Sequence, residues 1–486
     1  MTSYPQETFA AGTEQAVSVR WTLASLSLSM LLASLGTSIA NVGLPTLAGA
    51  FSASFQEVQW VVLAYLLAIT TLIISVGRLG DIVGRRKLLL AGIALFTMAS
   101  ASCAAAPHLS WLVAARAVQG LGAAVMMALA MAMVGEAVPK ERTGSAMGLL
   151  GTMSAIGTAL GPSLGGVLIG GFGWRAIFLV TVPCGLLALF LGHHALPAAR
   201  PRAKSTRPAF DVIGTLVLAL TLGAYALAMT IGGGTFGTIN LILLLAAIFG
   251  ICAFLFVESR AASPLVRLAT LREPRLRSGL ATSMLVATVM MTTLVVGPFY
   301  LSRGLGLDAA LVGLVMSAGP VVSALAGVPA GRLVDRFGAG RMAAAGLGIM
   351  AIGCLALSVV PQPFGVAGYV MALVTLTAGY ALFQAANTTG VMKDARPEQR
   401  GIVSGLLNLS RNLGLVTGAS VMGAVFSFAA TASAFATADS VAAAAGMRAT
   451  FAVATVLVVF AAAIAVASRV HVVEPTPEET EGVGGS

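Results

Sequence analysis

The charged residues best placed to do chemistry stand in one short stretch, GRLGDIVGRRK at 77–87, and in its partial copy, GRLVDRFGAGR at 331–341. The first stretch carries five charges in eleven residues, although only 9% of the whole chain is charged. Its single carboxylate, Asp81, can accept a hydrogen bond from an arginine or face a helix N-terminus. Two copies at matching positions favour an ion pair that breaks and re-forms as two parts of the molecule move. The alternative is a turn that only fixes topology.

We expect both copies to be tight turns between helices. Gly77 and Gly84 would allow close backbone approach or a positive φ. The basic residues would hold the turn on one side of a membrane. The residues that make up this turn motif are Gly77, Arg78, Asp81, Gly84, Arg85, Arg86, Gly331, Asp335 and Gly338.

Two arginines, Arg116 and Arg411, fall inside predicted apolar helices. An arginine within a membrane is costly and usually marks a functional site. Arg116 can bond backbone carbonyls or Gln119, or change the pKa of a nearby carboxylate; for both arginines a structural hydrogen-bond network is the alternative. The other candidates for a substrate cavity are Asn41, Trp60, Tyr65, Gln384 and Asn387, although Tyr and Trp also gather at membrane interfaces.

None of the 18 carboxylates falls in the middle of a predicted helix. Glu57, Glu136 and Asp81 are the remaining candidates for proton coupling, and each has a structural alternative. The four cysteines stand singly, so we predict neither a metal site nor a disulfide. With no nucleophile–base set and no GxxxxGK[ST] motif, we expect no enzyme, no cofactor and no direct use of ATP.

The composition indicates that the chain is a membrane protein. Hydrophobic residues make up 58% of the 486 residues, and the mean hydropathy is +0.94. Apolar runs of about 20 residues, long enough to cross a bilayer, recur from end to end. We predict spans near 21–45, 57–77, 88–106, 110–134, 145–169, 175–195, 212–231, 238–257, 278–301, 311–331, 342–360, 366–390, 402–428 and 448–468.

The lysines and arginines lie mostly in the segments on one side of the predicted membrane. With the N-terminus in the cytoplasm, 23 of the 28 Lys and Arg fall in inside termini and loops, three fall outside, and two lie within helices. This asymmetry follows the positive-inside rule and predicts that both termini are cytoplasmic. The net charge of +10 is therefore a topology signal, and we expect no nucleic-acid partner.

Two internal repeats predict two related halves. Residues 331–349 repeat 77–95 at a distance of 254, and Gly414, Gly418 and Gly423 repeat Gly157, Gly161 and Gly166 at a distance of 257. Parallel repeats of this kind occur in transporters whose substrate site lies between the halves. We predict a cytoplasmic N-terminus at 1–20, a six-helix half at 21–195, linkers with two extra helices at 196–277, a second six-helix half at 278–468, and a disordered cytoplasmic tail at 469–486.

Four motifs in order resemble the major facilitator superfamily. The stretch 77–87 resembles its motif A, and RAVQGLGAA at 116–124 resembles its helix-4 motif, with Arg116, Gln119 and Gly120. GTALGPSLGG at 157–166 resembles the antiporter motif of helix 5, and QWVVLAYLL at 59–67 resembles helix 2 of the fourteen-helix drug:proton antiporter branch of the EmrB/QacA type. The antiporter motif comprises Gly157, Gly161, Pro162, Gly165 and Gly166, whose glycines form a packing groove and whose proline permits a bend.

The resemblance implies an all-α membrane protein of the major facilitator fold that exports drugs or amphiphilic small molecules across the bacterial inner membrane. It further implies alternating access, protons as coupling ions and a monomeric carrier. One position departs from the pattern, because Gly36 stands where this branch usually carries a helix-1 acid. The alternative is therefore a facilitator or exporter of one neutral or anionic metabolite with altered or absent proton coupling.

Overall fold

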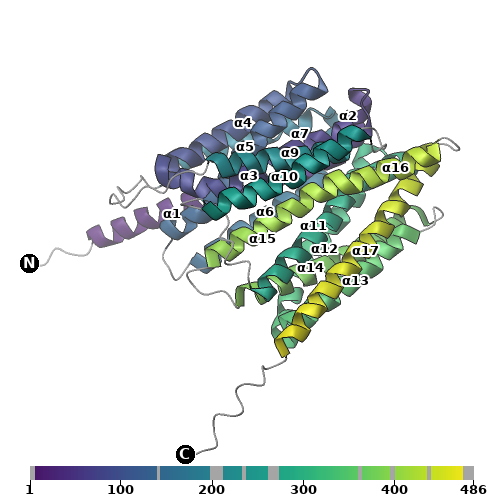
Figure 1. Cartoon of the computed structure of the whole chain (residues 1–486). Helices are drawn as coiled ribbons and strands as arrows, with labels where there is room; N and C mark the ends of the chain where they lie inside the picture. Colours follow the sequence, from purple (N-terminus) through teal and green to yellow (C-terminus); the bar gives the residue numbers. More distant parts are fainter. Residues whose placement is uncertain are drawn as a thin grey trace, which may run out of the picture.

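The computed structural model describes residues 6–138, 143–196, 212–231, 237–260, 273–359, 364–393, 400–434 and 439–473. Within these residues, 14 helices are long and apolar enough to cross a membrane, which confirms the predicted count. They form two halves of six spanning helices that lie side by side, with two further helices between them in the chain (Figure 1). The predicted all-α membrane fold is confirmed.

The first half contains six spans and two short helices. Its elements are α1 (Gln6–Val42), α2 (Leu44–Ala50), α3 (Phe55–Val83), α4 (Arg85–Ala104), α5 (Leu109–Ala137), α6 (Thr143–Phe172), α7 (Ala176–Leu179) and α8 (Thr181–Ala195). α1 begins well before the predicted start at 21, because polar residues ahead of the apolar run can also form helical hydrogen bonds. The predicted span 175–195 is divided into α7 and α8, since Pro183 has no N–H to bond the carbonyl of Leu179.

The second half repeats this order of spans. Its elements are α11 (Pro274–Phe299), the π-helix η3 (Tyr300–Gly304), α12 (Ala309–Phe337), α13 (Ala339–Val359), α14 (Gly365–Lys393), α15 (Arg400–Thr417), the π-helix η6 (Gly418–Met422), α16 (Gly423–Ala434) and α17 (Asp439–Val473). Here α15, η6 and α16 together make one membrane span. The predicted domain boundaries stay predictions, because residues 197–211, 261–272 and 474–486, which include most of the predicted tail, lie outside the described residues.

The first turns of α1 and the last turns of α17 lie at the same end of the helix bundle (Figure 1). We call this the terminal end and the opposite one the distal end. α3 runs from the distal end to the terminal end, and α4 returns. Equivalent helices of the two halves run in the same direction, as parallel repeats require.

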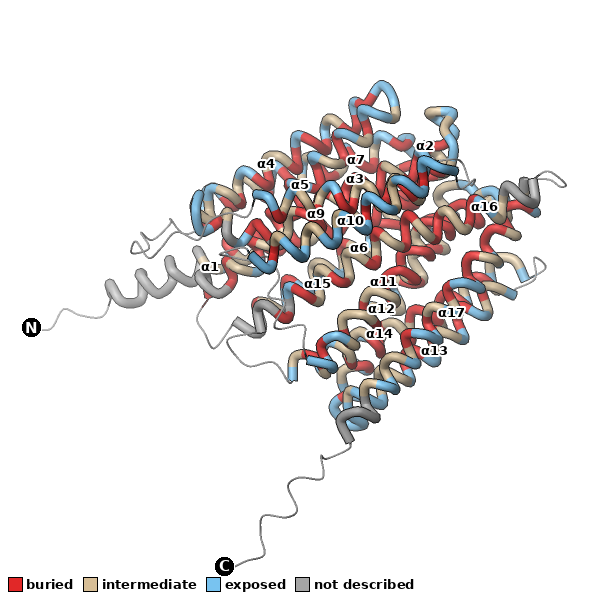
Figure 2. The backbone as a smooth tube through the Cα atoms, viewed as in Figure 1, coloured by how far each residue is buried: buried red, intermediate tan, exposed pale blue. Residues whose placement is uncertain are grey.

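The two extra helices are α9 (Val212–Thr230) and α10 (Thr238–Arg260). α9 contacts α3 of the first half and η6 and α16 of the second, so it covers the line along which the halves meet. Hydrogen bonds join Ser75 to Thr215 at 2.8 Å and Trp60 Nε1 to Thr230 Oγ1 at 3.2 Å. α10 is far more exposed, since only 11% of the residues in its most apolar stretch are buried. Most of its side chains lie on the outer surface of the bundle (Figure 2).

The repeated charged stretches are largely helical, so each predicted turn between helices is much shorter than the stretch itself. α3 continues to Val83 and α4 begins at Arg85, so the turn is the single residue Gly84, with φ at +100°. Gly338 makes the equivalent turn with φ at +86°. Glycine is needed at both turns because other residues rarely adopt this conformation. Gly77 and Gly331 have open space around them, so the close approach expected at Gly77 is wrong.

Candidate functional site

Arg116 is the centre of a buried polar network inside the first half. Its side chain on α5 is 0% exposed. Nε donates to the carbonyl of Val61 on α3 at 2.8 Å, and one terminal nitrogen donates to the carbonyl of Gly36 on α1 at 3.0 Å. The other terminal nitrogen donates to Oε1 of Gln119 at 2.6 Å. One arginine therefore joins α5 to the backbones of α1 and α3.

Two further side chains complete this network. The guanidinium carbon of Arg116 lies 4.1 Å from the ring centroid of Tyr65, a cation–π distance, and the Tyr65 hydroxyl donates to the carbonyl of Ala33 at 2.7 Å. Nε2 of Gln119 donates to Oγ of Ser100 on α4 at 2.7 Å. We call Arg116, Gln119, Tyr65 and Ser100 the arginine network.

Gly36 and Ala33 are the contacts between the arginine network and α1. A methyl group added at Gly36 would lie 2.8 Å from the Tyr65 hydroxyl oxygen and 3.3 Å from Phe96. An acidic side chain at this position would therefore displace Tyr65. The partners of Arg116 are neutral groups, so the buried cation is stabilised by dipoles and an aromatic face rather than by a helix-1 carboxylate.

The antiporter motif lies on α6, between the two halves. Gly157, Gly161 and Gly165 pack against the backbone of α1, and Oγ of Ser38 donates to the Gly157 carbonyl at 3.3 Å. Gly166 points the other way, to α12 of the second half. A methyl group on Gly166 would lie 2.8 Å from Cα of Gly313.

The first distal seam is this contact between α6 and α12. A methyl group on Gly313 would lie 2.7 Å from Cα of Gly166 and would also collide with the carbonyl of Pro162. Because both glycines lie near the distal ends of their helices, the halves touch backbone to backbone at that end. Close contact of this kind depends on small residues.

The second distal seam joins α3 to η6 and α16. Nε2 of Gln59 donates to the carbonyl of Ala419 at 2.7 Å, and Gln56 forms a hydrogen bond with Ser427. The Gln59 side chain lies directly against Gly423. The predictions for the substrate cavity did not include Gln56, Gln59 or Gly313, because only the docking of the halves shows that these residues meet across the molecule.

The charged turns are unequal in the two halves. Asp81 pairs with Arg85 across Gly84, with Oδ1 3.0 Å from the terminal nitrogen and 3.2 Å from Nε. Arg86 donates to the carbonyl of His193 at the end of α8. Asp335 is exposed and makes no ion pair within the described part of the chain, since Ala339 stands where Arg85 would be. The side chain of Arg78 lies outside the described residues.

The other cavity candidates are dispersed. Asn41 is buried and donates to the carbonyl of Thr37 at 2.9 Å, but Trp60 is turned to α9. Asn387 donates to the carbonyl of Gly279 at 3.1 Å and lines a cavity inside the second half. Gln384 and Arg411 are half-buried, and Arg411 makes no hydrogen bond or ion pair with the described residues. The predicted group of Gln384, Asn387 and Arg411 is therefore not joined by hydrogen bonds.

The two predicted proton-coupling acids differ in what the structure describes. Glu57 is exposed and caps α3, accepting from the backbone N–H of Ser54 at 2.7 Å. The side chain of Glu136 lies outside the described residues. Glu258, on the last turns of α10, is 2% exposed and is the one carboxylate among the buried side chains that the structure describes. Sequence reasoning placed it at a helix edge, and only the packing of α10 buries it.

The family assignment comes from comparison with known proteins. The model of the Major Facilitator Superfamily matches residues 26–419. The chain belongs to the major facilitator superfamily. It is therefore a multi-pass membrane transporter, as predicted.

Several curated transporters resemble the chain over most of its length. The multidrug resistance protein Stp of Mycobacterium tuberculosis (strain H37Rv) is 31% identical over 409 residues, which cover 84% of this chain and 75% of that protein. The riboflavin transporter RibZ of Clostridioides difficile (strain 630) is 28% identical, over 83% of this chain and 87% of that protein. The tetracenomycin C resistance and export protein of Streptomyces glaucescens is 29% identical, over 84% and 76%.

Solved structures support the same fold. A bacterial homologue of the human lysosomal transporter Spinster, inward-facing and unoccupied, aligns with a TM-score of 0.69 at 18% identity, over 95% of this chain and 99% of that one. The D-xylose–proton symporter aligns with a TM-score of 0.66 at 16% identity, over 92% and 97%. At these identities the likeness concerns the fold alone.

Proposed function

We propose that this transporter exports drugs and other amphiphilic small molecules across the inner membrane of a bacterium, as a monomer, by alternating access coupled to protons. The observation that carries the proposal is the pair of distal seams. They close the line between the halves at one end of the bundle through small contacts that a rocking motion can separate. The resistance and export proteins among its relatives support this class of substrate.

The orientation follows from the basic residues. Lys and Arg gather in the segments at the terminal end, so that end faces the cytoplasm and the distal seams face the periplasm. With the distal seams closed, the described conformation would accept its substrate from the cytoplasmic side. Opening of the seams would then release the substrate outside.

We assign the arginine network the role of linking substrate or proton binding to movement of α1 and α3. Arg116 joins these two helices through the carbonyls of Gly36 and Val61. A shift of either helix must break a charge-assisted hydrogen bond inside a low-dielectric interior. Asn41 is a second contact for substrate, because its Oδ1 is buried without a hydrogen-bond partner in the described part of the chain.

The coupling carboxylate is a separate question. Glu57 caps α3, which is a structural role for that residue. Because Glu258 is buried, we add it to Glu57 and Glu136 as a candidate for proton coupling. A buried carboxylate in a membrane helix is costly when charged and can take up a proton there. Glu258→Gln keeps the shape of the side chain and removes this capacity.

A second function is supported by Gly36 and Arg116. The buried cation and the missing helix-1 acid favour neutral or anionic substrates over cationic ones. The riboflavin transporter among the relatives agrees with a carrier of one such metabolite. Half-buried Arg411 would then contact the anionic group, and Arg411→Ala would abolish transport of anions while sparing neutral substrates.

The deciding experiment measures proton flux and substrate uptake together in everted membrane vesicles that contain the full chain. Vesicles that lack the transporter are the control. Ethidium, riboflavin and an anionic dye are added in turn under a pH gradient. Proton release with ethidium that is lost in Glu258→Gln supports the drug exporter and its coupling site. Uptake of riboflavin or the anion without proton release would favour the metabolite carrier, and no uptake of any compound would overturn both.

A further inference from the structure

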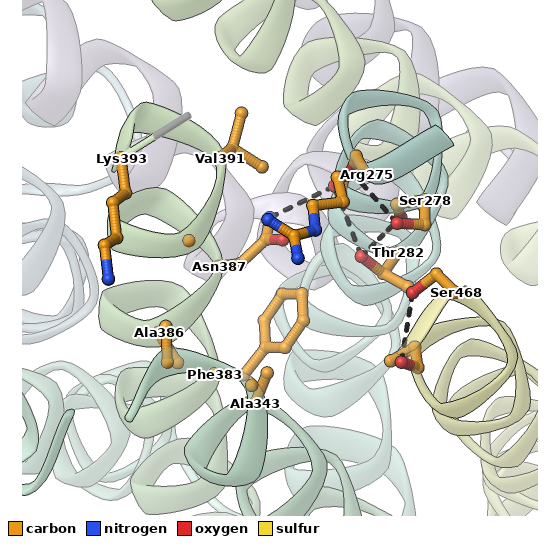
Figure 3. Close-up of a pocket in the computed structure, with 15 residues that line it drawn as sticks. Arg275, Ser278, Thr282, Ala343, Phe383, Ala386, Asn387, Val391, Lys393 and Ser468 are labelled. Atoms are coloured by element: carbon orange, nitrogen blue, oxygen red, sulfur yellow. Dashed lines mark hydrogen bonds between the residues drawn. The ribbon is translucent and has the colours of Figure 1, made fainter. Parts of the chain in front are cut away.

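A cavity opens at the terminal end inside the second half, away from the arginine network. It has a volume of about 400 Å³ and lies between α11, α13, α14 and α17. Arg275 and Lys393 stand at its mouth and are exposed. Figure 3 shows the Arg275 guanidinium turned toward the space between the helices, with Asn387 beside it.

The cavity exists because the two charged turns differ. Gly340 lies 254 residues after Arg86, and Ala339 takes the place of Arg85. In the first half the Arg86 side chain crosses to the end of α8 and bonds the His193 carbonyl. In the second half Ala339 and Gly340 line the cavity and leave that volume empty.

The walls combine positive charge with an apolar interior. The first N–H groups of α13 have no acceptor within the helix, and they begin at Ala339, which lines the cavity. Phe383, Ala343 and Ala465 form apolar parts of the wall. Among the described residues that line the cavity there is no carboxylate. These features suit an anion that carries an apolar part.

We propose that this cavity binds the phosphate headgroup of an anionic phospholipid from the leaflet at the terminal end. Arg275 and Lys393 would hold the phosphate, the arginine through two parallel N–H bonds and the lysine as a point charge. Both residues lie at helix ends, Arg275 in the first turn of α11 and Lys393 at the last residue of α14, at the depth where headgroups lie. The apolar wall would receive the start of an acyl chain. The bound lipid would hold α11 and α14 to α13.

The test is native mass spectrometry of the full chain, titrated with phosphatidylglycerol or with phosphatidylcholine of the same acyl chains. We expect phosphatidylglycerol to bind at least roughly tenfold more tightly than phosphatidylcholine. The double variant Arg275→Gln/Lys393→Gln loses this preference. Arg277→Gln, on the same helix and outside the cavity, keeps it. Gly340→Leu, which fills the mouth and retains both charges, loses it as well.

Thermal unfolding in detergent micelles shows whether each variant is folded. A preference for phosphatidylglycerol that survives in folded Gly340→Leu or in the double variant would overturn the site. Glycerol phosphate distinguishes the source of the phosphate. If it displaces phosphatidylglycerol at equal concentration, the phosphate site is supported and its assignment to lipid is overturned.

Discussion

Helices α5 and α14 occupy equivalent places in the two halves, and each packs on its neighbour through a glycine. A methyl group on Gly122 of α5 would lie 2.8 Å from the carbonyl of Gly92 on α4. A methyl group on Gly379 of α14 would lie 2.7 Å from the carbonyl of Gly346 on α13. The backbone framework is thus the same in both halves, and it depends on the same glycines.

The side chains on this common framework differ. With Gly122 and Gly379 in register, Arg116 corresponds to Leu373, and Gln119 corresponds to Leu376. Both leucines are buried in an apolar cluster. The second half therefore shows that a helix in this place packs well with apolar residues at these two positions, so the fold does not require an arginine there. Burying a charged arginine within a membrane helix costs free energy, so its presence in the first half indicates a role in transport.

The distal seams repeat this contrast. Gly313 lies 254 residues after Gln59, and Gly423 lies 257 residues after Gly166. The two contacts, Gly166 with Gly313 and Gly423 with Gln59, are therefore related by the repeat. In the first contact two backbones touch. In the second the Gln59 side chain lies against Gly423 and donates to the nearby carbonyl of Ala419. Equivalent helices thus use different forces, and substitutions can separate their contributions.

The largest effect is expected from Arg116→Ala. Loss of the guanidinium removes three hydrogen bonds from the buried network, and each buried acceptor left without a donor costs about 1–3 kcal/mol. We expect transport to be abolished and the melting temperature to fall. Leu373→Ala is the matched control, which should cost about 2–5 kcal/mol of stability and retain transport. Equal transport in the two variants would show that Arg116 acts only in packing.

The next effect is expected from Gly313→Leu. The new side chain collides with Gly166 and Pro162, so the first distal seam cannot close. We expect transport to fall by at least roughly tenfold. We also expect Gly313→Leu/Ser427→Cys to react faster with an external maleimide than Ser427→Cys alone. Gly327→Leu on the same helix, where a side chain meets open space, is the control. Normal transport in Gly313→Leu would mean that this seam need not close.

A smaller effect is expected from Gln59→Ala. It removes the bond to the Ala419 carbonyl, and one such bond contributes about 1 kcal/mol. We expect the second seam to open about fivefold more often, measured as faster maleimide labelling of the cysteine at Ser427. An unchanged labelling rate would show that the Gln59–Ala419 bond does not help to keep the second seam closed.

The smallest effect is expected from Asp81→Asn. The Asp81–Arg85 pair is partly exposed, and such i,i+4 pairs contribute about 0.3–0.5 kcal/mol. We expect transport to fall about twofold while the amount of protein in the membrane stays the same. Asp335→Asn serves as the control, because Asp335 makes no ion pair in the described part of the chain. Full activity in Asp81→Asn would show that breaking and re-forming of the Asp81–Arg85 pair is not part of transport.

The sequence predicted the helices well because each span is a local property. A run of about 20 apolar residues identifies a span without any knowledge of its neighbours. The glycine repeat likewise located the turns at Gly84 and Gly338. The predicted cavity residues fared differently, because Trp60 is bonded to α9 and Asn387 lies inside the second half. The side of a helix that faces a cavity depends on how the helices dock.

By itself, the sequence determined the fourteen spans, the two halves and the buried arginine, since hydropathy and internal repetition are written along one chain. Only the tertiary structure decided what these residues contact. It placed the carbonyl of Gly36 against Arg116 and Gly166 against Gly313, and it buried Glu258 on a helix that is mostly exposed. Contacts between residues far apart in the chain depend on the packing of helices, and the spacing of residues along the chain does not contain that packing.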